Sequence, residues 1–177
     1  MTSPLFQFCT DLQTRLDRLA DVTGQTVAWL TIAMMLITCL VVFLRYLLNM
    51  GSIALQESVT YLHGMVFLLG IAYTMKQKAH VRVDIIYQKL DPRTKCWMDL
   101  LGTLLFLFPV SIFITWVSIE YVQFSWNLLE GSAEPGGLPG VFLLKSLIPL
   151  MAVLLFLQGV AELLRNALIL LAGPSDT

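Results

Sequence analysis

The sequence predicts an all-α integral membrane protein with four transmembrane helices and both termini in the cytoplasm. Three observations predict it. Hydrophobic residues make up 57% of the 177 residues and charged residues only 13%, with a mean hydropathy of +0.77, which does not fit a water-exposed surface. Four apolar runs are each long enough to cross a bilayer core, which needs about 20 helical residues. Lys and Arg are concentrated between the second and third runs, and this marks the cytoplasmic side.

Residues 1–24 are expected to form a separate amphipathic helix. Phe8, Leu12, Leu16 and Leu19 recur at helical spacing, and charged residues lie between them. We therefore expect this helix to lie on the membrane surface or against a partner before the first span. The segment lacks the basic and apolar regions of a signal peptide.

The first two spans are predicted at about residues 26–48 and 53–75. The first ends at Arg45, and the short connection means that the second returns directly beside it. Arg45 is therefore the expected ion-pair partner of Glu57, with Lys145 as the second choice and a coupling or proton-site carboxylate as the functional alternative.

The second span is the least apolar of the four, and its polar residues form two neighbouring helical stripes. The first stripe is Gln56, Thr60 and His63, and the second is Glu57, Tyr61 and Gly64. Polar groups at membrane depth must face other helices, a partner or water, because contact with hydrocarbon is unfavourable. A packing role is favoured for His63 over a haem-ligating one, which would need a second buried histidine.

The basic connector, residues 75–97, carries most of the chain's cations and suits anionic lipid head groups. Asp91 followed by Pro92 predicts the start of a helix that continues into the third span, about residues 98–119, where Pro109 should cause a kink. The fourth span is expected at about residues 141–163, followed by a cytoplasmic tail, residues 166–177. This arrangement places nine Lys and Arg residues inside and two, Arg45 and Lys145, outside.

The sequence contains no phosphate-binding loop, no Cys/His metal pattern and no nucleophile with a matching base, so we do not expect an enzyme or a cofactor. It also lacks the internal repeat of a complete secondary transporter. These features favour a subunit that docks against a larger membrane protein. Two alternatives remain, an autonomous four-helix homodimeric transporter with Glu57 as its proton site and a haem-binding membrane anchor using His63.

The order of several features resembles a known family. Arg45-Tyr46 ends the first span, Glu57 opens the second, and His80-Val-Arg82-Val-Asp84 follows it. Together they resemble the small membrane subunit (DctQ-type) of tripartite ATP-independent periplasmic (TRAP) transporters over about residues 19–165. The family often has two adjacent acids where this chain keeps only Glu57, so the resemblance implies no paired-carboxylate role here.

The resemblance implies the small permease subunit of a sodium-coupled importer of an organic acid in the bacterial inner membrane. Its implied partners are a large DctM-type elevator subunit, which would hold the sodium and substrate sites, and a periplasmic DctP-type binding protein. The small subunit would act as a stator, that is, as part of the fixed scaffold against which the moving domain of the large subunit slides. The segment from Glu130 to Pro139, with Lys145-Ser146, is similar to a family branch linked to 2-oxo acids.

The resemblance also implies roles for individual residues. Residues of the second span would make helix contacts, in the bundle or with the large subunit. His80, Arg82 and Asp84 would anchor the cytoplasmic connector. Four residues would be available to the binding protein: Glu120, Glu130, Glu134 and Lys145.

Overall fold

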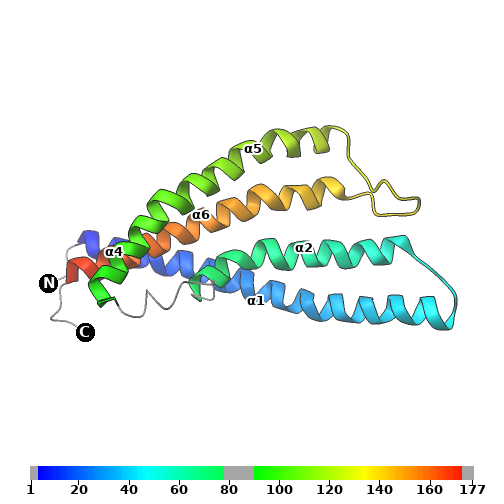
Figure 1. Cartoon of the computed structure of the whole chain (residues 1–177), viewed down its shortest axis with the longest axis horizontal. Coiled ribbons are helices and arrows are strands. Elements are labelled where there is room, and N and C mark those ends of the chain that lie inside the picture. Colours follow the sequence, from blue (N-terminus) through cyan, green and yellow to red (C-terminus); the bar gives the residue numbers. More distant parts are fainter. Residues whose placement is uncertain (1–3, 78–89, 173–177) are drawn as a thin grey trace.

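The computed structural model describes residues 4–77 and 90–172, which form long helices and their connections. Figure 1 shows α5, α6, α2 and α1 stacked in that order. Both termini lie at one end of the long axis, and the α1–α2 turn and the 128–140 loop lie at the other (Figure 1). Within these described ranges, four helical stretches are long and apolar enough to span a membrane, as the sequence predicts.

The first helix differs from the expectation of a separate interfacial helix. α1 is a single helix, Pro4–Leu47, of 44 residues. No proline interrupts it, and its single interior glycine, Gly24, gives a close contact with Tyr73 of α2. At 1.5 Å per residue α1 is about 66 Å long, roughly twice a bilayer core. A long part of α1 therefore extends beyond its apolar run while remaining attached to the bundle.

α2, Ile53–Lys76, matches its predicted span to within one residue at its C-terminal end. Ser52 caps its N-terminus by accepting a hydrogen bond from the backbone N–H of Leu55. Asn49 in the preceding turn adopts a positive φ of 52°, a conformation that asparagine tolerates better than most residues. The tight turn brings α2 back along α1, and the two helices pack together.

The third span begins as predicted and contains an irregularity near Pro109. Asp91 accepts a hydrogen bond from the backbone N–H of Thr94, and Pro92 opens α4, Pro92–Gly102. A π-helical turn, η1, Thr103–Leu107, joins α4 to α5, Phe108–Asn127. Pro109 would clash with the carbonyl four residues earlier in a regular α-helix, and the wider turn relieves that clash.

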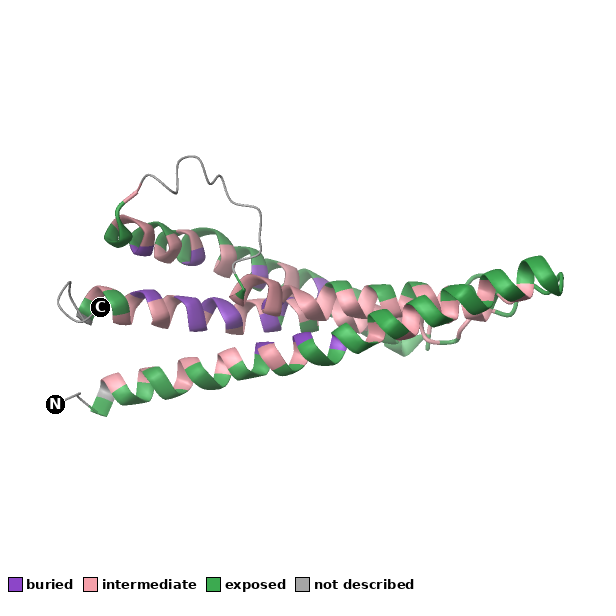
Figure 2. Cartoon of the chain, turned by 90° about the horizontal axis from the view of Figure 1, so that it is seen from below, coloured by how far each residue is buried: buried purple, intermediate pink, exposed green. Residues whose placement is uncertain are grey.

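α6, Val141–Ala172, continues nine residues beyond the predicted end of the fourth span, into the segment expected as a tail. It packs against α1, α2, α4 and α5 and is the centre of the fold. Small residues allow this packing: Ser111, Ser118 and Ser125 recur every seven residues on α5 and are buried. Figure 2 shows that the buried positions cluster along α6 and the helices beside it, while the far part of α1 is mostly exposed.

Candidate interaction surfaces

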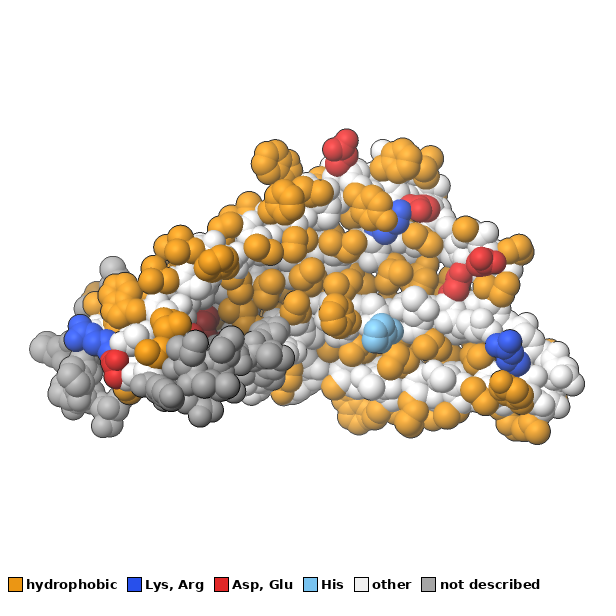
Figure 3. All heavy atoms as spheres, viewed as in Figure 1, with side chains coloured by type: hydrophobic (Ala, Val, Ile, Leu, Met, Phe, Trp, Pro, Cys, Tyr) orange, Lys and Arg blue, Asp and Glu red, His pale blue; other side chains and the backbone are white. Residues whose placement is uncertain are grey.

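The surface of the described helices is largely apolar and exposed. Figure 3 shows hydrophobic side chains over most of one face. Bulky side chains such as Trp29 on α1 and Trp116 on α5, 72% and 76% exposed, have few protein neighbours. A surface of this kind must meet lipid or another protein, because large apolar patches are unfavourable in water.

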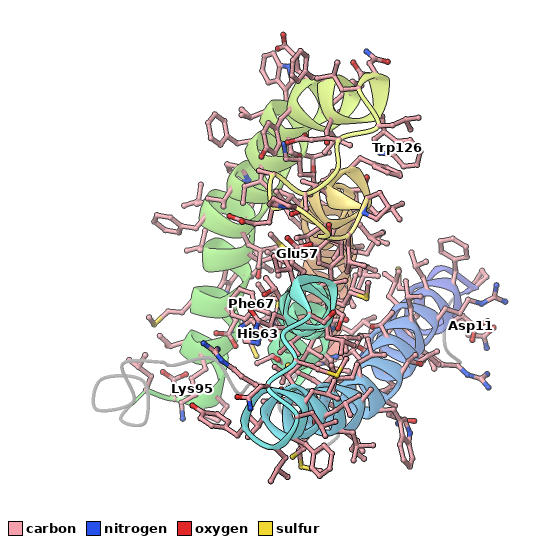
Figure 4. All side chains as sticks on the ribbon, turned by 90° about the vertical axis from the view of Figure 1, so that its right-hand side faces the viewer. Asp11, Glu57, His63, Phe67, Lys95 and Trp126 are labelled. Atoms are coloured by element: carbon pink, nitrogen blue, oxygen red, sulfur yellow. The ribbon has the colours of Figure 1, made fainter. Side chains whose placement is uncertain are left out.

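The two polar stripes of α2 face in different directions. Gln56, Thr60 and His63 are exposed, and Phe67 continues this stripe with 67% exposure. Figure 4 shows His63 and Phe67 pointing to the same side of α2, whereas Glu57 lies toward the 128–140 loop. The exposed stripe therefore presents polar groups outward at membrane depth, where nothing in the described chain covers them.

The second stripe packs against the rest of the chain. A Cβ atom on Gly64 would lie 2.9 Å from Leu144 Cδ1, so glycine allows α2 and α6 to approach closely here. The Tyr61 ring lies under Gly140, and its buried hydroxyl has no hydrogen-bond partner among the described residues.

Glu57 binds the 128–140 loop instead of pairing with Arg45. One carboxylate oxygen accepts a hydrogen bond from the Ser132 hydroxyl and the other accepts one from the Leu138 backbone N–H at 2.6 Å. The expectation of an Arg45–Glu57 ion pair is therefore wrong in this structure. A loop that is distant in sequence supplies two donors to Glu57, and Arg45 remains exposed.

A second set of contacts holds the start of this loop to α5 and α6. The Glu130 carboxylate accepts hydrogen bonds from Lys145 at 2.5 Å and from the Ser125 hydroxyl at 2.6 Å. These two donors lower the pKa of Glu130. The Lys145 ammonium also lies 4.2 Å from the centre of the Tyr121 ring, a cation–π contact. Glu130 and Lys145 thus hold the loop, whereas Glu120 and Glu134 are exposed.

The end of the bundle near the termini is held by a group of charged and polar side chains that we call the basal cluster. Its members are Asp17, Asp21, Lys76, Gln158, Glu162 and Arg165. Arg165 Nη2 donates to both carboxylate oxygens of Asp17, at 2.8 and 2.9 Å, and Nη1 donates to Glu162. Gln158 also donates to Asp17, at 3.1 Å, and Lys76 pairs with Asp21 at 2.5 Å. The cluster connects α1, α2 and α6.

Sequence reasoning did not find the basal cluster. Its members come from three helices, and only Asp17 and Asp21, or Gln158, Glu162 and Arg165, are close in sequence. One signal in the sequence could have predicted it: Gln158, Glu162 and Arg165 lie on the same face of a mainly apolar helix, where polar side chains need partners.

Some predicted residues lie outside the described part of the chain. His80, Arg82 and Asp84 fall in residues 78–89, so their expected role in the connector stays a prediction. Within the described ranges, no group of three or more His, Cys, Asp and Glu side chains is arranged to hold a metal ion.

These features define a class: a four-span, all-helical membrane protein with an exposed polar face, typical of a subunit that needs a partner. The family model of the DctQ component of tripartite ATP-independent periplasmic transporters matches residues 34–168. The chain belongs to this family, whose members are transporter components and not enzymes. Searches of curated proteins and of solved structures gave no match. A tripartite system implies a large membrane subunit and a periplasmic binding protein as partners.

Proposed function

We propose that this chain is a stator: it binds the large membrane subunit of its transporter through the exposed stripe of α2 and stays fixed while that subunit moves. The observation that carries the proposal is the outward position of Gln56, Thr60 and His63. Polar side chains at membrane depth are unfavourable against lipid, and hydrogen bonds across a helix interface satisfy them. Family membership supplies the partner.

We further propose that the termini and the basal cluster lie on the cytoplasmic side of the bacterial inner membrane. Most of the chain's Lys and Arg residues belong to the helices at this end or to the sequence that connects α2 to α4. The 128–140 loop then faces the periplasm. Anionic lipid head groups would contact the basic connector.

The transported compound in this proposal is an organic acid of the dicarboxylate or 2-oxo acid type, imported with sodium. The organic acid and the sodium coupling come from the family resemblance of the whole chain, and the 2-oxo acid type comes from the segment Glu130 to Pro139 with Lys145-Ser146. The substrate and sodium sites belong to the large subunit, and this chain contributes the fixed scaffold.

The autonomous-transporter alternative gains less support. Both carboxylate oxygens of Glu57 are engaged by the loop, so a proton-carrying role would need the loop to release them.

Purification of the tagged chain with its large subunit tests the proposal. We expect the two subunits to be recovered in fixed ratio, and we expect a Gln56→Leu/His63→Leu variant to lose the large subunit while keeping its own fold. Ser58→Ala is the matched control, because the Ser58 hydroxyl bonds within its own helix, to the Leu55 carbonyl. Recovery of wild-type chain only as a homodimer would contradict the proposal.

A further inference from the structure

We propose that a groove between α5 and α6 binds one phospholipid, phosphatidylethanolamine, with an acyl chain in the groove and the head-group ammonium on Glu120. The groove shares no residue with the polar stripe of α2, to which the stator assignment gives the large subunit. The inference therefore does not depend on that assignment.

The body of the groove is apolar. It has a volume of about 360 Å³, and its walls include Ile112 of α5 and Val153 and Phe156 of α6. The hydroxyl groups of Ser111 and Thr115 also line it, but each donates to a backbone carbonyl of the preceding turn, at 2.8 Å. An apolar space of this kind takes a hydrocarbon occupant, because water would find few hydrogen-bond partners there.

The groove is closed at the end nearer the basal cluster. There the Phe156 ring packs against the Phe108 ring, with 4.7 Å between the ring centres. Further along α6, Gly159 lets η1 approach closely, since a Cβ atom on this glycine would lie 2.4 Å from Leu107 Cδ2. An acyl chain must therefore enter from the other end or from the open side of the groove.

At its other end the groove adjoins a second, more polar depression of about 300 Å³. Trp116 and Ile119 line both depressions, whereas Glu120 and Gln123 line only the second. Together with Ile112 these residues fall on one face of α5 at helical spacing. This face therefore changes from apolar to polar along its length, as a phospholipid does.

The length of the apolar part matches one leaflet of a bilayer. Glu120 lies nine residues after Ser111, which is about 14 Å of helix at 1.5 Å per residue. The hydrocarbon of one leaflet is about 15 Å thick, half of a core of about 30 Å. With the groove among the lipid tails, Glu120 lies at the level of the head groups, where the third predicted span ends.

The charge at this end selects the head group. Glu120 and Gln123 are exposed, and α5 contains no Lys or Arg. Lys145, near the start of α6, is engaged by Glu130. A lipid ammonium therefore meets the Glu120 carboxylate without a competing cation on α5, whereas the anionic head group of phosphatidylglycerol meets a like charge. The Gln123 amide supplies a hydrogen-bond donor for the lipid phosphate.

The test uses photoreactive lipids with the assembled transporter. The complex is placed in vesicles of equal amounts of phosphatidylethanolamine and phosphatidylglycerol, and one or the other lipid carries a diazirine in its acyl chain. After illumination, adducts on the peptides that line the groove are quantified by mass spectrometry. We expect roughly two- to fivefold more adduct from phosphatidylethanolamine, the preference that one partly exposed ion pair gives.

Two variants test the head-group contact and the groove separately. Glu120→Gln removes the charge and keeps the shape, so the two lipids should give equal yields. Val153→Trp fills the groove from a position that is 42% exposed, so adducts from both lipids should be lost. The matched controls are Glu134→Gln, at an exposed acid, and Leu150→Trp, at an exposed position of α6, both outside the groove. Both controls should keep the preference of the unchanged complex.

Three results would overturn the proposal. Equal yields from the two lipids in the unchanged complex would remove the head-group contact, and adducts that persist in Val153→Trp would remove the groove as the site. Adducts on the isolated chain but not on the complex would show that the large subunit covers the groove. None of these results concerns recovery of the large subunit with the chain, which tests the stator assignment separately.

Discussion

Replacing Gly24 with alanine tests how closely α1 and α2 pack. A Cβ atom at this position would lie 2.3 Å from Tyr73 Cγ and 2.6 Å from Tyr73 Cβ, far inside any real contact distance. Tyr73 Cβ is attached to the α2 backbone and cannot rotate away, so the helices must separate. Gly24→Ala is therefore an overpacking substitution at the point where the extended part of α1 meets α2.

The expected change in the free energy of unfolding on Gly24→Ala is the result of two opposing effects. Overpacking a well-packed contact costs about 1–3 kcal/mol. Replacing glycine by alanine inside a helix gains about 1 kcal/mol from helix propensity. Gly102 provides the matched control, because it is helical and a Cβ there meets nothing within 4 Å. Gly102→Ala should show only the gain in helix propensity, which both variants share. The free energies of unfolding of the two variants should therefore differ by the overpacking cost, about 1–3 kcal/mol.

Unfolding by SDS in mixed micelles, followed by circular dichroism, gives both free energies under one set of conditions. Gly24→Ala should unfold at a lower SDS fraction than Gly102→Ala. If the two substitutions stabilise the protein equally, the described contact between α1 and α2 is not present in solution.

Two further predictions concern the charged contacts at the ends of the bundle. Asp17→Asn should lower the free energy of unfolding by roughly 1–3 kcal/mol, because Arg165 loses one of its two ionic partners and keeps only Glu162; unchanged SDS unfolding would contradict this. Because the pKa of Glu130 is lowered, its carboxylate stabilises the 128–140 loop fully above the ordinary pKa of 4.5, and this stabilisation is lost as pH falls through the lowered pKa. A spin label at residue 134 should therefore become mobile only in acid, and in Lys145→Met this change should occur at higher pH. Equal pH profiles in the two proteins would refute that assignment.

The sequence predicted the elements whose signals are local. The bounds of α2 follow from an apolar run after a very short connection, and the start of α4 follows from Asp91 and Pro92. The two neighbouring polar stripes of α2 were predicted from the sequence, although periodicity could not tell which stripe faces the bundle.

The features that were missed depend on contacts between distant residues. The partners of Glu57 lie 75 and 81 residues away, so proximity in sequence favoured Arg45 instead. The first helix was divided after the amphipathic segment, at Gly24, but no proline interrupts α1 and tertiary contacts of Asp17 and Gly24 support the helix on both sides of that point. The π-helical turn before Pro109 is a local response to proline, but proline alone predicts a kink and not its form.

The most direct test of the central claim is site-specific photo-crosslinking from α2 in the native membrane. A photoreactive residue at position 63 should cross-link to the large membrane subunit, because His63 lies on the exposed stripe. The same residue at position 61, two positions away but on the stripe that packs under Gly140, should react within its own chain. Cross-links from position 63 only to lipid or to a second copy of this chain would contradict the account.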